Sequence, residues 1–268
     1  MELNRIYNED CLEGMKRIPD KSVDMILCDL PYGTTACAWD TIIPFEPLWA
    51  EYKRVIKDNG AIVLTSSQPF TTALIQSNIR NFKHMWYWNK ETGGAFAVAK
   101  YRPLSIVEDI CVFTKSGERV NYYPIMEDAK PKNIRPANKG SSVSEAIPVA
   151  SGVARSREGY DVKKRYPRNV LTYNGRAQEI NSLNRVHPTQ KPVALFEYLI
   201  KTYTNKGETV LDNCMGSGTT AIACINTERN FIGFELDETY YNKSLERIKN
   251  HAPQTDIFNL MEGTYLWN

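Results

Sequence analysis

The stretch that most constrains the fold lies late in the chain, over residues 209–241. It begins with a short apolar run that ends in Asp212, a pattern typical of a buried parallel strand. Gly216 and Gly218 follow, and they let the backbone turn tightly and come close to a ligand. Residues 219–226 have helical spacing, so the glycine loop is expected to end at a helix N-terminus, which favours an anion.

A second apolar run follows this expected helix and ends at Glu235, about twenty residues after the glycines. In a nucleotide-binding βαβ unit, an acid at that place accepts hydrogen bonds from ribose hydroxyls. The whole unit predicts a nucleotide site, either for a dinucleotide or for S-adenosylmethionine (SAM). Asp212 favours SAM, because a carboxylate there would repel a pyrophosphate but could pair with an ammonium group.

The chain length of 268 residues predicts one large domain, or one domain with a sizeable insertion. The sequence has no run of eighteen apolar residues and no apolar signal core at its start, so the expected location is intracellular, without a membrane span. The six cysteines lack metal-ligand spacing, and Cys28, Cys111 and Cys224 lie inside apolar runs. We therefore expect reduced core thiols and neither a zinc site nor a disulfide framework.

The charge is unevenly distributed. Residues 115–185 hold fourteen Lys/Arg against seven Asp/Glu, a net charge of +7, which leaves −5 for the remainder of a chain whose total is +2. This distribution favours a polyanionic partner held on one side. The region has little periodicity, and basic residues alternate there with Tyr122, Tyr123, Tyr160, Tyr166 and Tyr173. That mixture suits phosphate pairing and stacking on nucleic acid, although on composition alone a solvated surface insertion is the alternative.

An early strand, expected over residues 22–28, ends in Asp29-Leu30-Pro31-Tyr32. Open α/β sheets place their ligands in loops of this kind. An ionised Asp29 and the Leu30 carbonyl, which Pro31 frees from any helix, could each accept a hydrogen from an exocyclic amine. Tyr32 offers a flat face on which a base can stack. The alternative is an ordinary loop with an acid at the end of a strand.

The other expected elements alternate between strands and helices. A short strand over residues 5–9 leads to Asp10, which either contacts a ligand or caps a helix. The aromatic strand 86–90 serves sheet packing or base contact. Helices are expected over residues 45–57 (capped by Asn59-Gly60), 70–77 and 240–249 and from Val193; strands over 61–64 and 106–114, with Val107, Ile110 and Val112 buried; and a flexible loop from Gly93-Gly94.

Three motifs together resemble those of amino-group DNA methyltransferases. Residues 29–32 are similar to the Asp-Pro-Pro-Tyr catalytic motif, residues 212–220 to the SAM loop Asp-Pro-Phe-x-Gly-Ser-Gly-Thr-Thr, and residues 185–192 to the His-Pro-x-x-Lys-Pro element before that loop. Their order is that of the β subclass, and residues 29–40 resemble phage and prophage adenine-specific members. Leu30 and Asn213-Cys214 depart from the usual prolines and phenylalanine, but neither change removes a group that does chemistry.

The resemblance implies an α/β fold with a doubly wound, mostly parallel, Rossmann-like sheet. Residues 1–114 would form the catalytic half, 115–184 an irregular basic target-recognition insertion, and 185–268 the SAM-binding half. The implied activity is site-specific methylation of adenine N6 in double-stranded DNA, with SAM as cofactor, base flipping and no metal. The implied location is the cytoplasm of a bacterial or phage-infected cell. A homodimer and a cognate restriction endonuclease are further partners that the resemblance leaves open.

The implied site has three parts. The catalytic residues are Asp29, Leu30, Pro31 and Tyr32. The cofactor-binding residues are Asp10 (for the adenine of SAM), Glu235 (for its ribose), Thr189 and Lys191 (for its amino-acid end), and Cys11, Asp212, Cys214, Gly216, Ser217, Gly218, Thr219, Thr220 and Phe234. The DNA-binding residues are Arg155, Arg157, Lys163, Lys164, Arg165 and Arg168.

Three other functions remain as alternatives. Cytosine N4 methylation needs the same geometry, but family members that act on cytosine more often have serine where Asp29 stands. A dinucleotide-dependent oxidoreductase would not need the Asp29 loop or the basic insertion. A catalytically silent DNA-binding module would not need intact motifs.

Overall fold

The structure is a computed structural model that describes residues 1–34, 40–94, 96, 99–117, 119–129, 163–174 and 190–251. The chain divides into two compact units: Met1–Tyr123 together with Asn169–Asn268, and Pro124–Arg168. Within the described residues, the first unit contains an eight-stranded sheet with helices, and the second contains a two-stranded ladder.

The sheet of the first unit is almost entirely parallel. Its strand order is β1 (Arg5–Asn8), β10 (Asn230–Glu235), β9 (Thr209–Asp212), β2 (Val23–Asp29), β3 (Ile56–Ser66), β5 (Ser105–Phe113), β4 (Phe82–Gly94) and β8 (Val170–Thr172). Only β5 runs against its neighbours. The predicted mostly parallel α/β fold is therefore confirmed. The strand order switches between β9 and β2, so the loops that follow these two strands meet at one edge of the sheet.

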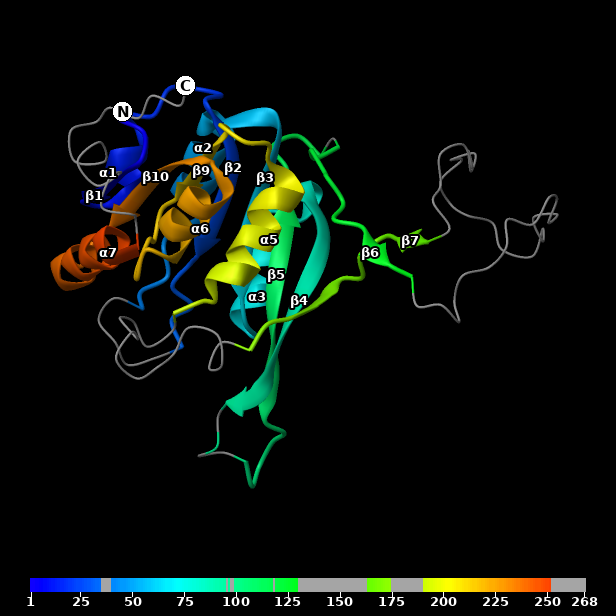
Figure 1. Ribbon diagram of the computed structural model, residues 1–268. Helices are drawn as coiled ribbons and strands as arrows, with labels where there is room; N and C mark the ends of the chain where they lie inside the picture. The colour runs from blue at the N-terminus through cyan, green and yellow to red at the C-terminus, as the bar shows by residue number, and fades with distance from the viewer. Residues whose placement is uncertain are drawn as a thin grey trace. The chain divides into compact units, whose positions relative to one another are not determined.

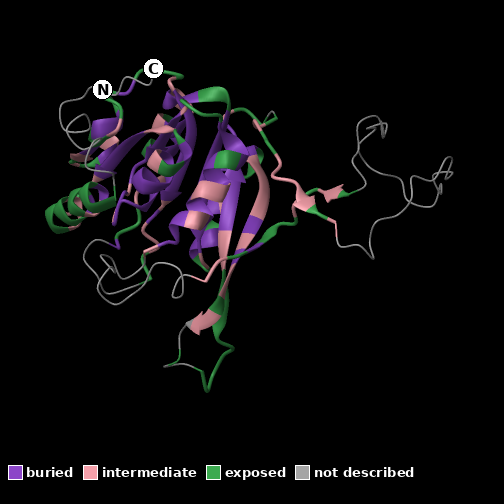
Figure 2. Ribbon diagram, in the orientation of Figure 1, coloured by how far each residue is buried: buried purple, intermediate pink, exposed green. Residues whose placement is uncertain are grey.

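Helices cover both faces of this sheet (Figure 1). One face packs against α1 (Cys11–Met15), α2 (Phe45–Val55) and α3 (Phe70–Ser77), and the other against α5 (Val193–Tyr203), α6 (Thr219–Thr227) and α7 (Glu238–His251); η1 (Ile79–Asn81) precedes β4. Alternate residues of β2 point to opposite faces: Met25 and Leu27 pack on the α5–α6 side, Ile26 and Cys28 on the α1–α3 side. Figure 2 shows these central strands as buried and much of α7 as exposed. Within the described residues, no helix is long and apolar enough to span a bilayer.

Gly60 does not cap a helix, contrary to the sequence prediction. Helix α2 ends at Val55, and the extended Ile56 begins β3 directly. A Cβ atom at Gly60 would lie 2.7 Å from the Asp24 carbonyl oxygen, and the β2–β3 register shifts between Val23 and Met25. The glycine is therefore explained by close contact between two strands at an irregularity of the ladder.

The β4–β5 hairpin is longer than the sequence predicts. Gly93 and Gly94 continue β4, with Gly94 opposite Ser105, and do not open a loop. Val107 is 40% exposed, whereas Ile110 and Val112 are fully buried as expected. The prediction for Val107 is wrong because residues 105–107 form the exposed end of β5. Figure 1 shows that the far end of the β4–β5 hairpin extends beyond the helices that cover the sheet.

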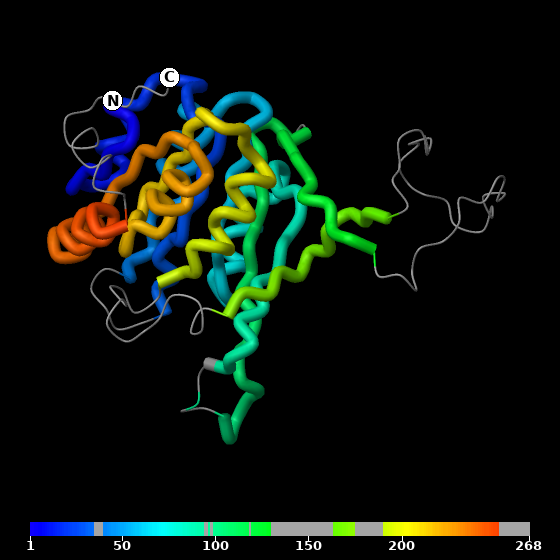
Figure 3. Tube along the Cα trace, viewed as in Figure 1, coloured from blue at the N-terminus to red at the C-terminus, as the bar shows by residue number. Residues whose placement is uncertain are grey.

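The expected insertion, residues 115–184, belongs partly to the first unit. The Tyr123 N–H donates to the Thr202 carbonyl at 2.8 Å, and β8 pairs with β4 (Figure 3). The second unit covers only residues 124–168, and its described part is the antiparallel pair β6 (Glu127–Asp128) and β7 (Lys164–Arg165).

Candidate active site

Asp29 ends β2 and is held by two hydroxyl groups. The Tyr32 hydroxyl donates to Asp29 Oδ1 at 2.7 Å, and the Thr65 hydroxyl donates to the same oxygen. Thr65 can do so because it lies opposite Asp29 in the β2–β3 ladder. Both bonds fix the orientation of the carboxylate and leave Oδ2 to other partners.

The loop after Asp29 is closed by an acid further along the chain. The backbone N–H groups of Gly33 and Thr34 donate to the two carboxylate oxygens of Asp40, each at 2.9 Å, and Gly33 adopts a positive φ of 66°. The Tyr32 ring stacks on Phe70 with its centroid 5.2 Å away. These contacts hold the Tyr32 ring beside the end of β2.

Lys191 joins the two predicted parts of the site. Its Nζ donates to Asp29 Oδ2 at 2.7 Å and lies 5.7 Å from the centroid of the Tyr32 ring. Its carbonyl oxygen accepts a hydrogen bond from Thr219 Oγ1 at 3.2 Å, at the start of α6. The side chain is only 6% exposed. Burial would lower the pKa of Lys191, but the charges of Asp29 and Glu108 outweigh burial and raise it above its ordinary value.

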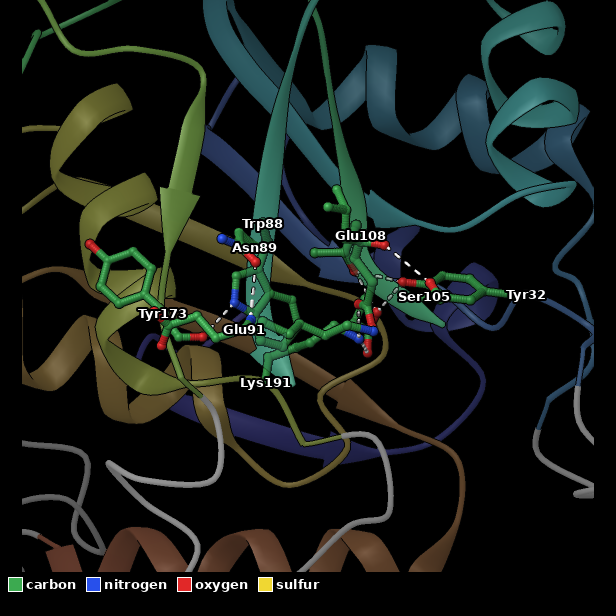
Figure 4. Close-up of polar contacts among 12 residues, drawn as sticks. Tyr32, Trp88, Asn89, Glu91, Ser105, Glu108, Tyr173 and Lys191 are labelled. Atoms are coloured by element: carbon green, nitrogen blue, oxygen red, sulfur yellow. Dashed lines mark hydrogen bonds and ion pairs between the residues drawn. The ribbon is translucent and has the colours of Figure 1, made fainter. Parts of the chain in front are cut away.

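Glu108, from β5, is the second acid beside Lys191. Its Oε2 lies 3.4 Å from Lys191 Nζ, and its Oε1 accepts from Lys90 Nζ at 2.9 Å. Burial would raise the pKa of Glu108, but the two lysines outweigh burial and lower it, so this carboxyl group is ionised. Figure 4 shows the side chains of Tyr32, Glu108 and Lys191 in one region of the structure, drawn from three separate segments of the chain.

Asp212 holds the glycine loop from beneath. Its carboxylate is 2% exposed and accepts from the Cys214 N–H at 3.0 Å and from the Thr220 hydroxyl. Burial raises the pKa of Asp212 to about 6, although these two hydrogen bonds act in the opposite direction. The structure therefore assigns Asp212 to the shape of the loop, and its contact with the ammonium group of SAM stays a prediction.

The glycine loop has the local geometry that the sequence predicts. Gly216 and Gly218 adopt positive φ angles of 53° and 77°, and α6 begins directly afterwards. Arg247 donates to the carbonyl of Ser217 at 2.9 Å and to the hydroxyl of Thr219 at 3.0 Å. Both hydroxyl-bearing residues are nearly buried, so their side chains stabilise the loop from within.

Glu235 and Asp10 lie together at the same edge of the sheet. Glu235 accepts from the N–H groups of Gly216 at 2.7 Å and Asp237 at 2.9 Å, and burial raises its pKa. Its neighbour across the β1–β10 ladder is Asn8, two residues before Asp10. Asp10 Oδ1 caps α1 through the Leu12 N–H at 2.8 Å. Two carboxylates beside a glycine turn fit the base and ribose of a nucleoside.

Four predicted cofactor residues lie beneath the loop or outside the described part. The Phe234 ring is fully buried, and a Cβ atom at Gly14 would collide with it, so it supports α1 and offers no surface to a ligand. Asn213 Nδ2 lies 3.5 Å from both Cys11 Sγ and Cys214 Sγ, which places the two thiols in the packing under the loop. Thr189 lies outside the described residues.

The predicted DNA-binding cations are partly paired with acids of their own unit. Lys164 donates to Asp128 at 2.6 Å, and Arg165 donates to Glu127. Lys163 and Arg168 are exposed, whereas Arg155 and Arg157 lie outside the described residues. Of the interleaved tyrosines, Tyr122 contacts the Tyr203 ring of α5, the Tyr123 N–H donates to the Thr202 carbonyl of α5, and the Tyr173 carbonyl accepts from Trp88 Nε1 at 2.8 Å. The DNA-binding role of this region stays a prediction.

Sequence reasoning missed Thr65, Glu108 and Asp40. Thr65 and Glu108 are polar residues inside strands that also contain apolar residues, which is a weak signal because such polar residues usually face solvent. Asp40 has no local signal, since its partners come six and seven residues earlier in the loop.

Comparisons with known proteins agree with this geometry. The family model described as DNA methylase (N6_N4_Mtase) matches residues 23–246. The chain is 26% identical to the Type II methyltransferase M1.MboII of Moraxella bovis, covering 91% of this chain and 96% of that protein. It is 27% identical to the DNA adenine methyltransferase YhdJ of Escherichia coli K12, covering 92% and 83%.

A solved structure extends this likeness to the fold and the cofactor. The crystal structure of the M1.HpyAVI–SAM complex superposes with a TM-score of 0.60 at 25% identity, covering 91% of this chain and 98% of that one. The two carboxylates and the glycine turn at the ends of β1, β9 and β10 fit the cofactor that the complex contains. The chain therefore belongs to the DNA methylase family, and it is an amino-group DNA methyltransferase that uses S-adenosylmethionine.

Proposed function

We propose that this methyltransferase modifies N6 of adenine, at a base flipped out of duplex DNA. The observation that carries the proposal is the position of Asp29: it ends β2, and β2 lies next to β9, whose loop is the candidate cofactor loop. An acceptor for the amine and the methyl donor would then meet at one edge of the sheet. Flipping is required because an exocyclic amine inside the base stack cannot reach such an edge.

The residues after β2 supply the chemistry of the amine. Bound SAM supplies an electrophilic methyl carbon whose bonding electrons stay with sulfur when the methyl group leaves. Asp29 and the Leu30 carbonyl each accept one amine hydrogen, which draws the nitrogen lone pair out of ring conjugation and towards the methyl carbon. The nitrogen would gain positive charge, which the carboxylate of Asp29 stabilises, until it releases one proton to water. Tyr32 stacks on the base.

Adenine is favoured over cytosine by two observations. The catalytic motif begins with Asp29, where family members that act on cytosine more often have serine. One relative, at 27% identity, is named as a DNA adenine methyltransferase. Mass spectrometry of nucleosides from the DNA of an expressing host tests this directly. N6-methyldeoxyadenosine is the expected product, and N4-methyldeoxycytidine in its place would overturn the choice of base. Long-read sequencing of the same DNA would give the recognition site.

The catalytic assignment is tested by Asp29→Ala. We expect this change to abolish methyl transfer and to leave SAM affinity largely unchanged, because Asp29 is proposed to bind the target amine. Transfer of labelled methyl groups to unmethylated amplified DNA measures the first, and calorimetry with SAM measures the second. Asp58→Ala is a suitable control, since Asp58 is a 59% exposed acid of β3 that pairs with Lys21. Turnover of Asp29→Ala at the rate of the control would contradict the assignment.

DNA recognition is proposed to depend on the basic region around the second unit. Supporting this are the net charge of +7 over residues 115–185 and the exposed side chains of Lys163, Tyr166 and Arg168. Lys164 and Arg165 contribute less than their charge suggests, because Asp128 and Glu127 already neutralise them. Sequence-specific contacts would come from residues that reach base edges.

A further inference from the structure

Lys191 occupies the positions that the proposed mechanism reserves for the target base. Its ammonium group donates to Asp29 Oδ2, the oxygen that Tyr32 and Thr65 leave unoccupied. The same group lies over the Tyr32 ring, whose other neighbour is Phe70. A flipped base needs both this oxygen and a free face of this ring. Lys191 therefore has to leave Asp29 before the amine can bind.

A buried ammonium group cannot leave one carboxylate without reaching another, because an unpaired buried charge is strongly unfavourable. Lys191 is 6% exposed, so water does not offer an easy alternative. The residue also cannot withdraw as a whole, since its carbonyl is hydrogen-bonded to Thr219. The change must be made by the side chain, and it needs an acceptor close by.

Glu108 supplies such an acceptor. Its Oε2 is buried and has no hydrogen-bond partner among the described residues, although Lys191 Nζ lies only 3.4 Å away. A buried carboxylate oxygen without a hydrogen bond is rare and calls for an explanation. The two contacts of Nζ, at 2.7 and 3.4 Å, differ by 0.7 Å, so a movement of that size towards Glu108 would reverse which acid is closer.

We infer that Glu108 is a positioning residue that receives the Lys191 ammonium group when the target base takes its place on Asp29. The inference rests on the proposed role of Asp29 as the amine acceptor. Asp29, Glu108, Lys191 and Lys90 carry two negative and two positive charges, so the exchange changes neither the net charge nor the protonation of the cluster. Glu108 touches neither substrate nor cofactor in this scheme and acts through Lys191.

The test is Glu108→Gln, which keeps the shape of the side chain and removes its charge. Lys191 then remains on Asp29, and kcat is expected to fall about 10- to 100-fold, the scale of a misplaced catalytic group. KM for SAM should stay unchanged. The assay is transfer of labelled methyl groups from SAM to unmethylated amplified DNA. If the glutamine variant does not accumulate as folded protein, Glu108→Asp replaces it. The shorter aspartate side chain keeps the charge but reaches Lys191 less well, so the kcat of Glu108→Asp should lie below that of the wild type.

Lys90→Gln is the matched control. Lys90 shares Glu108 with Lys191 but comes from β4, so its loss removes the cross-strand ion pair and leaves the acceptor for Lys191 intact. If Glu108 only joined β4 to β5, both variants would lose the same activity and the same thermal stability. We expect the kcat of Lys90→Gln to stay close to that of the wild type, because Glu108 keeps the charge that receives Lys191; its thermal stability should fall, because it leaves a largely buried carboxylate with one partner fewer.

A double variant separates the pathway through Lys191 from other effects. In the background of Lys191→Gln, Glu108→Gln should cause almost no further loss of kcat, because residues that act through one contact are not additive. The inference would be overturned if the fold-loss in kcat of the double variant equalled the product of the fold-losses of the two single variants. It would also be overturned by a Glu108→Gln enzyme with a raised KM for SAM and a normal kcat. A fully active Glu108→Gln enzyme beside an inactive Asp29→Ala enzyme would overturn this inference alone. An active Asp29→Ala enzyme would overturn the proposed function as well.

Discussion

Asp212→Asn should make the protein more stable at neutral pH. The carboxyl group is 2% exposed, and burial raises its pKa to about 6 from an ordinary 3.8. A raised folded-state pKa means that the protonated form favours folding. The stabilisation of the fold by the protonated Asp212 carboxyl group is complete below about pH 4 and is lost as the pH rises through 6. The shift of about two units corresponds to about 3 kcal/mol, at 1.36 kcal/mol per unit.

About half of this loss, roughly 1.5 kcal/mol, falls between pH 5 and pH 8. Asparagine cannot ionise, and its carbonyl can still accept from the Cys214 N–H, so the variant should lack this part of the pH dependence. Urea unfolding followed by tryptophan fluorescence at both pH values measures the difference. Asp20→Asn, which changes a 73% exposed acid, should keep the wild-type pH dependence. An Asp212→Asn curve parallel to the wild type would refute the reasoning.

Two further predictions concern the ligands. Glu235→Ala should weaken SAM binding by about 1.5–3 kcal/mol, the range for hydrogen bonds to a charged group, measured by calorimetry. Glu235→Gln is the control for loosening of the loop, because its side chain can still accept from the Gly216 N–H. If Glu235→Ala binds SAM as tightly as the wild type, Glu235 has a role in the loop only. The logarithm of the affinity for duplex DNA should fall with the logarithm of the salt concentration, with a slope of about −0.9 per phosphate contact. Replacing Lys163, Lys164 and Arg165 together by alanine should make that slope shallower and leave the SAM affinity unchanged. An unchanged slope would mean that these three cations serve the β6–β7 ladder and do not contact DNA.

The loops at the ends of the strands could be predicted because their signals are local. A buried strand, a terminal acid and a tight turn are adjacent in sequence at Asp29 and again at Asp212. The parallel order of the strands then brings the loops together without further information, since neighbouring strands that run in one direction end at one edge. The same reasoning reached Glu235, which ends the next strand.

The contacts of Glu108 could not be predicted in this way. An acid in the middle of a strand normally faces solvent, and its orientation is decided by the register of β5 between β3 and β4. The contacts of the interleaved tyrosines could not be predicted for a related reason. Composition does not show that the Tyr122 ring contacts Tyr203 of α5, or that the main chains of Tyr123 and Tyr173 bond to α5 and β4. The role of these tyrosines in a nucleic-acid surface stays a prediction. Residue composition describes a segment and cannot say which of its residues return to the sheet.

Lys191 connects the segment before the glycine loop with the candidate active site. The segment of residues 190–192 leads into α5, which packs beside α6, so its main chain runs past the first turn of α6 and accepts a bond from Thr219. Four methylene groups are enough for the side chain to reach across from there to Asp29. A lysine is suited to both connections, because its main chain fixes one end while its flexible stem lets the charge move between acids. An arginine could not exchange partners within 0.7 Å, since its planar fork commits two donors to a fixed geometry.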